Sequence, residues 1–492
     1  MADPERFSNL PEYAFPRLRR LLADVTPPAG VAPVVMTIGE PRHAIPDFVA
    51  PTLARSVGEL AKYPPNEGTP QFLDAVSGWL QTRYGLDIAP DRITALNGSR
   101  EGLFNAALAL CPERKNGGQP VVLIPNPFYQ VYAVAAAAVG ARAVFVPATD
   151  ATGHLPDYAA LDPAVLDATA ICYLCSPANP QGSVADRDYL ERLIALAERH
   201  DFVVFADECY SEIWRDAPPP GALEVAEAMG LPERVVVFNS LSKRSNLPGL
   251  RAGIAVGSRA NISRLRVLRS YSGAPVPLPM QRVAEVAWAD EAHVAASRAL
   301  YQEKYAIADR VLGNVPGYKG PAGGFFLWLP VADGEAAARQ LWAEAGVQVL
   351  LGAMTYLLPA TMGGGPAAVR AGNRELTRLS WLRVTVVQLC LILFVLPPAL
   401  TGSWVRAIAS ILGVLALAAF LPLMIRAVRA QVAARRAMIA ARAATADRGR
   451  PGDSEPGAEP GFAAGSAPWA RPGSAGGFPS AAPTTATAVA SV

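Results

Sequence analysis

Short apolar runs alternate with helix-like segments between about residue 90 and residue 260. The runs are apolar almost throughout, which is typical of strands buried on both faces of a sheet. This alternation predicts an α/β domain in which helices cover a mostly parallel sheet of seven strands. The predicted strands are Ile93–Leu96, Pro120–Pro125, Ala143–Pro147, Ala170–Cys175, Phe202–Ala206, Val235–Phe238 and Ile254–Val256. The helices predicted between them include Glu101–Leu110, Tyr129–Val139 and Asp186–His200.

The pattern changes at Gly273–Pro279, where proline and glycine residues predict a boundary. One long helix is predicted over Gln281–Leu312, a strand over Gly323–Trp328, and a short amphipathic N-terminal helix around Arg20. We therefore expect a second, smaller α/β domain. The predicted division is an N-terminal arm and part of the small domain in residues 1–45, a large domain in residues 46–275, and the rest of the small domain in residues 276–375.

Two stretches after residue 376 contain no charged residue. The first is the 22 residues between Arg383 and Arg406, and the second is the 19 residues between Arg406 and Arg426. Each is close to the roughly 20 residues that cross a bilayer as a helix. Arginines cluster before the first stretch and after the second, which favours a hairpin with both ends in the cytoplasm. A transmembrane hairpin is thus predicted within residues 376–430, with residues 384–425 in the membrane; a pair of buried core helices is the alternative.

Composition adds limits on compartment and partners. Residues 431–492 begin basic and then become rich in Pro, Gly, Ala and Ser from Arg448 onward, which predicts a disordered tail. The net charge of +2 gives no indication of a nucleic-acid partner. The N-terminus lacks the apolar core of a secretory signal, and the five scattered cysteines suit a reducing compartment. Cys172 and Cys175 are predicted to be buried strand thiols, and no metal site is predicted. We expect a cytoplasmic catalytic domain tethered to the inner membrane by the hairpin.

The segment Ser240–Gly253 contains the residues with the clearest chemistry. Lys243 lies among small hydroxyl residues just after a predicted strand, and Arg251 follows eight positions later. This arrangement suits a lysine that forms an imine with an aldehyde cofactor whose phosphate is held by Ser240, Ser242 and Arg251. The cofactor with these features is pyridoxal phosphate.

Other polar residues follow predicted strands. The pyridine nitrogen of this cofactor needs a carboxylate beside it, and Asp207 lies at the carboxyl end of a strand, where α/β sheets bind ligands. Tyr210 and Asn179 are candidates to contact the phenolic oxygen of the ring. The alternatives are a helix N-cap for Asp207 and an ordinary Asn-Pro turn for Asn179.

A phosphate is expected to bind the N–H groups at the start of a helix. Ser99 and Arg100 lie between a predicted strand and a predicted helix, so both are candidate phosphate ligands, with a simple N-cap by Ser99 as the alternative. Tyr129 is a candidate to stack on the cofactor ring, although core packing is the commoner role of an aromatic after a strand. The spacing around Tyr63 assigns it no role.

These motifs together resemble the class I/II aminotransferases of pyridoxal-phosphate fold type I, over roughly residues 5–355. Three segments, Ile38–Pro46, Asn126–Tyr132 and Ser242–Gly249, are most similar to N-succinyldiaminopimelate aminotransferase of lysine biosynthesis. The ordered motifs are Ile38–Pro41, Tyr63–Gly68, Asn97–Arg100, Asn126–Tyr129, Asn179–Gly182, Asp207–Tyr210 and Ser240–Arg251.

The resemblance implies that Lys243 is the imine lysine, with Asp207 at the ring nitrogen. It implies Asn179 and Tyr210 at the ring oxygen, and Tyr129 stacked on the ring. It also implies a homodimer in which Tyr63 reaches the partner's phosphate, and a contact between the Gly39 backbone and the substrate α-carboxylate. The implied reaction passes an amino group from a succinyl-diaminopimelate donor to 2-oxoglutarate, with a neutral Lys243 moving the α-proton.

The chain departs from this family after Val347–Ala353. The family has an arginine near its carboxyl end that pairs with the substrate α-carboxylate. Arg370 matches it better by spacing, and Arg383 by strand context. The predicted hairpin then replaces the last strand and closing helix of the small domain, through either a real fusion or a misjoined reading frame. The alternative functions are another transaminase or a β-lyase on the same fold, or a membrane-tethered protein without turnover.

Overall fold

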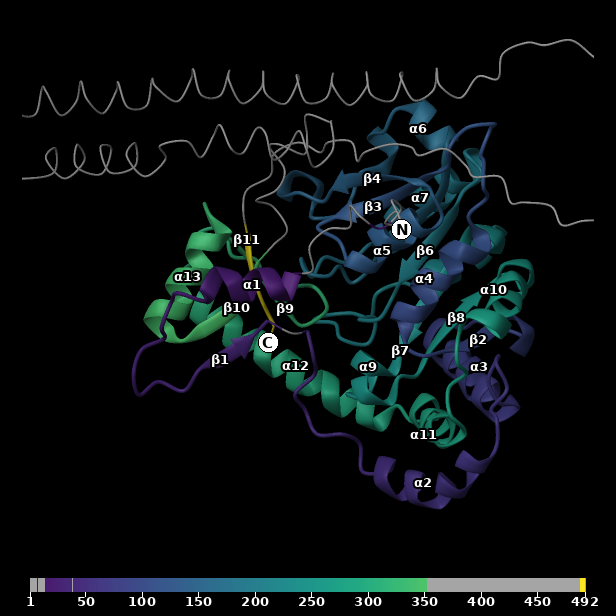
Figure 1. Cartoon of the computed structure of the whole chain (residues 1–492), viewed down its shortest axis with the longest axis horizontal. Coiled ribbons are helices and arrows are strands. Elements are labelled where there is room, and N and C mark those ends of the chain that lie inside the picture. Colours follow the sequence, from purple (N-terminus) through teal and green to yellow (C-terminus); the bar gives the residue numbers. More distant parts are fainter. Residues whose placement is uncertain (1–6, 8–13, 38, 352–486, 492) are drawn as a thin grey trace, which may run out of the picture. The chain divides into compact units, whose positions relative to one another are not determined.

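The computed structural model describes Phe7 and residues 14–37, 39–351 and 487–491, which belong to one compact unit. In this part of the chain the larger sheet has seven strands in the order β2-β8-β7-β6-β5-β3-β4 (Figure 1). Only β8 runs antiparallel to its neighbours, so the prediction of a mostly parallel sheet is confirmed. The strands are β2 (Ile93–Leu96), β3 (Val121–Asn126), β4 (Arg142–Pro147), β5 (Thr169–Cys175), β6 (Val203–Asp207), β7 (Val235–Ser240) and β8 (Gly253–Gly257).

Helices cover both faces of this sheet, which explains why its strands are apolar almost throughout. Every residue of β5 and β7 is buried, including the thiols of Cys172 and Cys175, as predicted. The core on one face includes α3 (Pro70–Tyr84), α7 (Arg187–Arg199), α8 (Ala222–Ala228) and α11 (Leu278–Ala289). The core on the other face includes α4 (Ser99–Leu110), α5 (Gln130–Ala138) and α10 (Arg259–Ser272).

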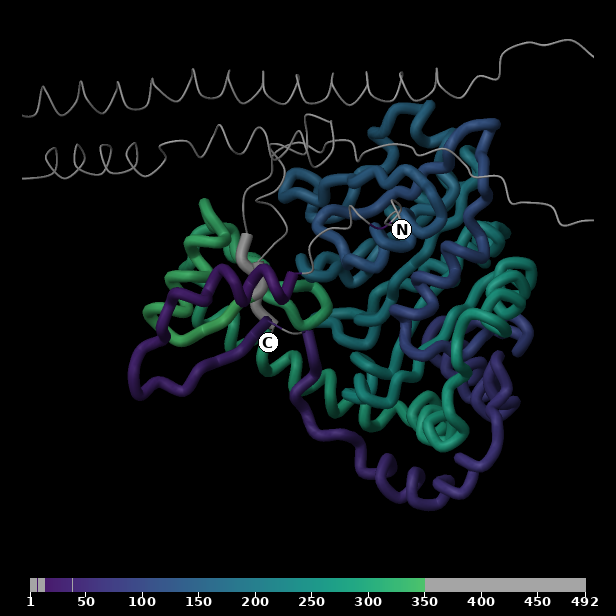
Figure 2. The backbone as a smooth tube through the Cα atoms, viewed as in Figure 1, coloured from purple at the N-terminus to yellow at the C-terminus, as the bar shows by residue number. Residues whose placement is uncertain are grey.

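A second, smaller sheet has the strand order β1-β10-β11-β9. Its strands are β1 (Val34–Met36), β9 (Phe326–Pro330), β10 (Val347–Leu351) and β11 (Thr487–Ser491). Helices α1 (Ala14–Leu22) and α13 (Gly334–Ala345) pack beside it. In Figure 2 the described residues 39–48 lead into α2 (Val49–Ser56), and the 3-10 helix η2 (Val57–Ala61) follows.

The single helix predicted over Gln281–Leu312 is wrong, because the structure has two helices, α11 and α12 (Ala292–Leu312). The backbone of Asp290 is extended, with φ −100° and ψ 120°, and this interrupts the helix. Its carboxylate accepts the backbone N–H of His293 at 3.0 Å, which satisfies one of the first donors of α12. A single capping residue barely changes the hydrophobic period, so the pattern did not show the break.

Two further predictions need correction. The strand predicted over Gly323–Trp328 begins only at Phe326, because Gly324 has a φ of +75° and forms a turn. The disorder predicted for the tail does not hold for Thr487–Ser491, whose backbone pairs antiparallel with both β9 and β10. These five residues contain neither Pro nor Gly, unlike the stretch before them.

The predicted hairpin in residues 376–430 lies outside the described residues, as do Arg370 and Arg383. Among the helices that the structure does describe, none combines the length and the apolar character needed to span a bilayer.

Candidate active site

Lys243 lies on the short helix α9 (Leu241–Arg244), which begins directly after β7. The hydroxyl of Ser240 caps this helix by accepting the N–H of Ser242 at 3.1 Å. The Lys243 amine donates to the carbonyl oxygen of Gly39. Its Nζ lies 5.1 Å from the centre of the Phe325 ring and 6.0 Å from that of Tyr210. The amine therefore faces an aromatic wall at the end of the sheet.

The surroundings of Lys243 favour its neutral form. Burial, the largest cause, lowers the pKa of its amine to about 8, and the nearby Arg251 acts in the same direction. Cys209, Glu40 and Asp207 oppose this shift. A lysine that serves as nucleophile or general base needs such a lowered pKa, because only the neutral amine has a free electron pair.

Asp207 ends β6 and is only 5% exposed. Its Oδ2 accepts a hydrogen bond from the hydroxyl of Tyr132 at 2.7 Å. Burial raises the pKa of Asp207, while hydrogen bonds from Cys209 and Tyr132 and the charge of Lys243 lower it. Tyr132 stacks on Tyr173 with ring centres 4.4 Å apart, and the sequence pattern alone assigned it no role. Its position three residues after Tyr129, in the first turn of the helix predicted over Tyr129–Val139, is the signal that could have suggested one.

A cradle of backbone and cationic groups forms where α4 begins. Gly98 has φ +80° and ψ 159°, a conformation that only glycine adopts readily. The Arg251 guanidinium donates to the carbonyl oxygen of Asn97 at 3.0 Å, and an added Cβ on Gly98 would lie 2.2 Å from its Nη2. The guanidinium thus lies directly against the first turn of α4, which starts at Ser99.

Hydroxyl groups complete the cradle. Ser99 Oγ accepts a hydrogen bond from the thiol of Cys209 at 3.0 Å, which ties the start of α4 to the segment after Asp207. The Ser240 hydroxyl donates to Ser242 Oγ at 2.9 Å. Arg100 donates through Nε to the hydroxyl oxygen of Tyr129 at 2.5 Å, so the predicted phosphate ligand and the predicted stacking ring contact each other.

The remaining predicted residues lie in different places. Tyr210 lies beside both Lys243 and Phe325: its ring centre is 6.0 Å from the Lys243 amine and 5.4 Å from the centre of the Phe325 ring. Asn179 follows β5, which pairs with β6 so that Cys175 is opposite Asp207, and Asn179 therefore lies at the same edge of the sheet. Tyr63 is fully exposed, and the structure does not bring its side chain into this cluster.

The donor set fits pyridoxal phosphate. A doubly charged phosphate suits the first turn of a helix together with hydroxyls and a guanidinium. An aldehyde suits a lysine of lowered pKa, and a pyridine nitrogen suits a buried carboxylate. The sequence signals that predicted these roles lay at the ends of β2, β6 and β7, and the structure places those ends together.

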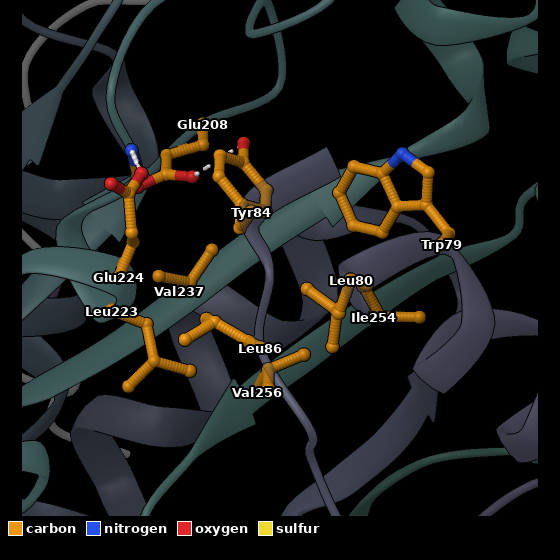
Figure 3. A pocket seen from close by; sticks show the side chains of 11 residues that line it. Trp79, Leu80, Tyr84, Leu86, Glu208, Leu223, Glu224, Val237, Ile254 and Val256 are labelled. Carbon is orange, nitrogen blue, oxygen red and sulfur yellow. Dashed lines mark hydrogen bonds between the residues drawn. The ribbon is translucent and has the colours of Figure 1, made fainter. Parts of the chain in front are cut away.

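A small cavity on the opposite face of the sheet is separate from this cluster (Figure 3). It is mostly apolar, includes Trp79 and Val237 in its lining, and measures about 10 Å³, which is roughly the space for one water molecule. Glu208 lines it and accepts the N–H of Ala222 at 2.7 Å, and burial raises the pKa of this carboxyl to about 7. The side chains of Asp207 and Glu208 therefore lie on opposite faces of the sheet. The cavity itself is too small to hold a substrate.

Replacing Gly98 with alanine tests the cradle. We expect Gly98→Ala to lower the free energy of unfolding by about 1–3 kcal/mol, because alanine is strained at this φ and its Cβ meets Arg251. It should also weaken retention of pyridoxal phosphate, measured by dialysis. Gly78→Ala is the matched control, since a Cβ there meets nothing within 4 Å inside helix α3. Urea unfolding of both variants measures the free energy of unfolding. A wild-type value for Gly98→Ala would contradict this description of the cradle.

The chain is similar to known proteins over most of this region. A model of the family Aminotransferase class I and II matches residues 32–386. An LL-diaminopimelate aminotransferase of Dehalococcoides mccartyi is 30% identical over 71% of this chain and 90% of its own length. A 4-dedimethylamino-4-oxo-anhydrotetracycline transaminase of Streptomyces rimosus is 32% identical over 65% of this chain and 85% of its own. A solved aminotransferase of Neisseria meningitidis is 36% identical, with a TM-score of 0.67, over 73% of this chain and 90% of its own. The chain belongs to the class I and II aminotransferases, which depend on pyridoxal phosphate.

Proposed function

We propose that this aminotransferase takes its amino group from a diaminopimelate-derived donor, with N-succinyl-diaminopimelate as the first candidate, and passes it to 2-oxoglutarate. The observation that supports amino transfer most strongly is the Lys243 amine, which has a lowered pKa and faces Tyr210 and the Gly39 carbonyl. The similarity of Ile38–Pro46 to the succinyl-specific enzymes supports this donor. The relatives named for LL-diaminopimelate support the same carbon skeleton without the succinyl group.

The proposed roles follow from the chemistry of each side chain. When bound, pyridoxal phosphate supplies the electron sink that makes the α-proton of the substrate acidic. Lys243 Nζ removes that proton and returns it, and Asp207 holds a proton on the pyridine nitrogen. Asn179 and Tyr210 donate to the phenolic oxygen, Tyr129 stacks on the ring, and the Gly39 backbone meets the α-carboxylate. The proposed phosphate ligands are Ser99, Arg100, Ser240, Ser242 and Arg251, with Tyr63 added from a partner subunit.

The capture of cofactor should depend on pH through Lys243. Below pH 8 most of its amine is protonated, so raising the pH by one unit should speed covalent capture of pyridoxal phosphate about tenfold. Above about pH 8 the rate should level off, because the amine is then mostly neutral. Stopped-flow absorbance on the cofactor-free full-length chain measures this. A rate that keeps rising to pH 10 would show an unperturbed lysine and contradict the burial argument.

Arg370 is the proposed ligand of the substrate α-carboxylate, with Arg383 as the alternative, and both lie inside the family match of residues 32–386. Replacing each with alanine separately identifies the ligand, because only the residue that pairs with the carboxylate should raise the KM for both substrates strongly.

Assembly and membrane contact are further parts of the proposal. The fully exposed Tyr63 lies close in sequence to Val57 and Leu60, which are 59% and 61% exposed, and such an apolar surface supports a homodimer. Analytical ultracentrifugation with Tyr63→Ala as the variant tests it. Membrane contact through residues 384–425 rests on their composition alone, in which Arg406 is the single charged residue, and fractionation of cell membranes tests it.

A donor screen on the purified holoenzyme tests the reaction. Candidate amino acids are added singly while the visible absorbance of the cofactor is recorded. We expect the band to be lost with N-succinyl-diaminopimelate or LL-diaminopimelate and to return with 2-oxoglutarate. Release of ammonia without a keto acceptor would favour a β-lyase instead. A band that no donor changes would favour a cofactor-binding protein without turnover.

A further inference from the structure

The three residues that follow Lys243 all contact one corner of the fold. Arg244, Ser245 and Asn246 each hydrogen-bond to residues between Ala287 and Ser297, where α11 ends and α12 begins. Figure 1 shows α9, which bears Lys243, beside these two helices. None of these contacts belongs to the cofactor cradle or to the aromatic wall, so they have no role in the site as described above.

Arg244 holds the first of these contacts. Its guanidinium is 1% exposed and lies near the rings of Trp288 and Trp79, at 5.0 and 5.7 Å from their centres. It donates to the carbonyl oxygen of Ala287 at 2.5 Å and to the carboxylate of Glu291. It thereby supplies a cation and donors to the carbonyl end of α11, which would otherwise lack partners.

Ser245 makes the second contact through a relay of three side chains. The ring nitrogen Nε2 of His293 lies 2.8 Å from Ser245 Oγ, and its Nδ1 lies 2.5 Å from the carboxylate of Asp290. Burial lowers the pKa of His293. The hydrogen bond to Asp290 raises it, but by less, so the pKa is lowered overall. A neutral ring donates from Nδ1 to Asp290 and accepts the Ser245 hydroxyl proton at Nε2.

This relay has the order of residues found in Ser-His-Asp hydrolases, but its surroundings exclude that chemistry. The Ser245 side chain is fully buried, at 0% exposure, so no substrate can reach its oxygen in this structure. The hydroxyl is instead committed to His293 and to a weaker contact at 3.4 Å from Arg244. The relay therefore fixes the position of the backbone at Ser245, which lies two residues after Lys243.

Asn246 makes the third contact, and helix α12 extends the connection. The Asn246 amide donates to Ser297 Oγ at 3.2 Å. One to two turns further along α12, Tyr301 stacks on Phe325 with ring centres 5.8 Å apart, and the Tyr305 hydroxyl donates to the Gly324 carbonyl oxygen. The helix that anchors the chain after Lys243 thus also supports the wall that the Lys243 amine faces.

We propose that Ser245, His293 and Asp290 are positioning residues that hold the Lys243 amine in reach of its reaction partners, with α12 fixing the lysine and its aromatic wall to each other. The inference rests on the proposed role of Lys243 in capturing the cofactor. It requires no contact between the relay and the substrate. Loss of the relay should therefore slow reactions of Lys243 while leaving the KM for substrates nearly unchanged.

The test measures the rate constant for covalent capture of pyridoxal phosphate by the cofactor-free full-length chain. The variants are Ser245→Ala, His293→Gln and the double replacement. His200→Gln is the matched control, because His200 also pairs with an aspartate, at 2.7 Å from Asp167, and its side chain is 12% exposed against 11% for His293. Thermal unfolding confirms that each variant is folded, and Ser245→Ala decides the outcome if His293→Gln does not fold.

We expect each single replacement to slow capture about tenfold and the double replacement to slow it no further, because both break one relay. His200→Gln should capture at the wild-type rate. The inference is overturned if Ser245→Ala captures at the wild-type rate, if His200→Gln is slowed equally, or if the two effects multiply. A wild-type chain that fails to capture the cofactor would overturn the proposed function of Lys243 as well, so the two failures are distinguishable.

Discussion

Replacing Lys243 with alanine is expected to slow amino transfer by roughly 10²–10⁴-fold or more, since proton transfer by a positioned base contributes that much alone. The proposed base, the Lys243 amine, lies beside the rings of Tyr210 and Phe325. Its pKa, lowered to about 8 by burial, leaves a useful neutral fraction near physiological pH. Steady-state kinetics with a donor found in the screen measures the effect. The fall should appear in kcat and in kcat/KM alike, because the lost group acts in the transition state.

Two companion variants separate chemistry from charge. Lys243→Arg keeps the positive charge but cannot supply a neutral amine, so it should be as inactive as the alanine variant. Lys319→Ala removes a lysine that is 69% exposed and paired with Asp150, and it should retain wild-type kcat. Substantial activity in Lys243→Arg would mean that a different group moves the proton.

Replacing Asp207 with asparagine is expected to lower kcat by roughly 10²–10³-fold, the size seen when one preorganised electrostatic group is removed from an active site. The amide has nearly the same volume and can still accept the Tyr132 hydroxyl bond, now 2.7 Å long. What it lacks is the negative charge that, in the proposed role of Asp207, would hold a proton on the pyridine nitrogen. The loss should therefore appear in kcat with little change in the thermal unfolding temperature.

Neighbouring replacements serve as controls for Asp207. Tyr132→Phe leaves the carboxylate but removes one of its hydrogen bonds, so a smaller fall of about tenfold is expected. Glu208→Gln alters the adjacent buried carboxyl, which lines the small cavity on the other face of the sheet, and kcat should stay close to wild type. If Asp207→Asn kept wild-type kcat, the carboxylate would have no part in the chemistry.

The large sheet could be predicted because its strands have a strong local signal. Burial on both faces makes each strand a continuous apolar run, and the runs end where polar residues begin. The carboxyl ends of neighbouring parallel strands then meet at one edge. Asp207 and Lys243 are far apart in the sequence, but each lies at the end of such a run. This is why they come close together in the fold.

The features that could not be predicted depend on single residues or on distant contacts. The break between α11 and α12 depends on one aspartate cap, and the late start of β9 depends on one glycine with positive φ. Tyr132 meets Asp207 across 75 positions of sequence, and no period contains that information. The hydrogen bond between Ser245 and His293 joins residues 48 positions apart, so the sequence pattern could not predict it either.

The location of the covalent link to the cofactor tests the proposed role of Lys243 without any kinetic assumption. The loaded full-length chain is reduced with borohydride, digested and examined by mass spectrometry. The chain has five lysines, namely Lys62, Lys115, Lys243, Lys304 and Lys319. We expect the reduced adduct on Lys243 alone. An adduct on another lysine, or a firmly bound cofactor with no adduct at Lys243, would contradict that role.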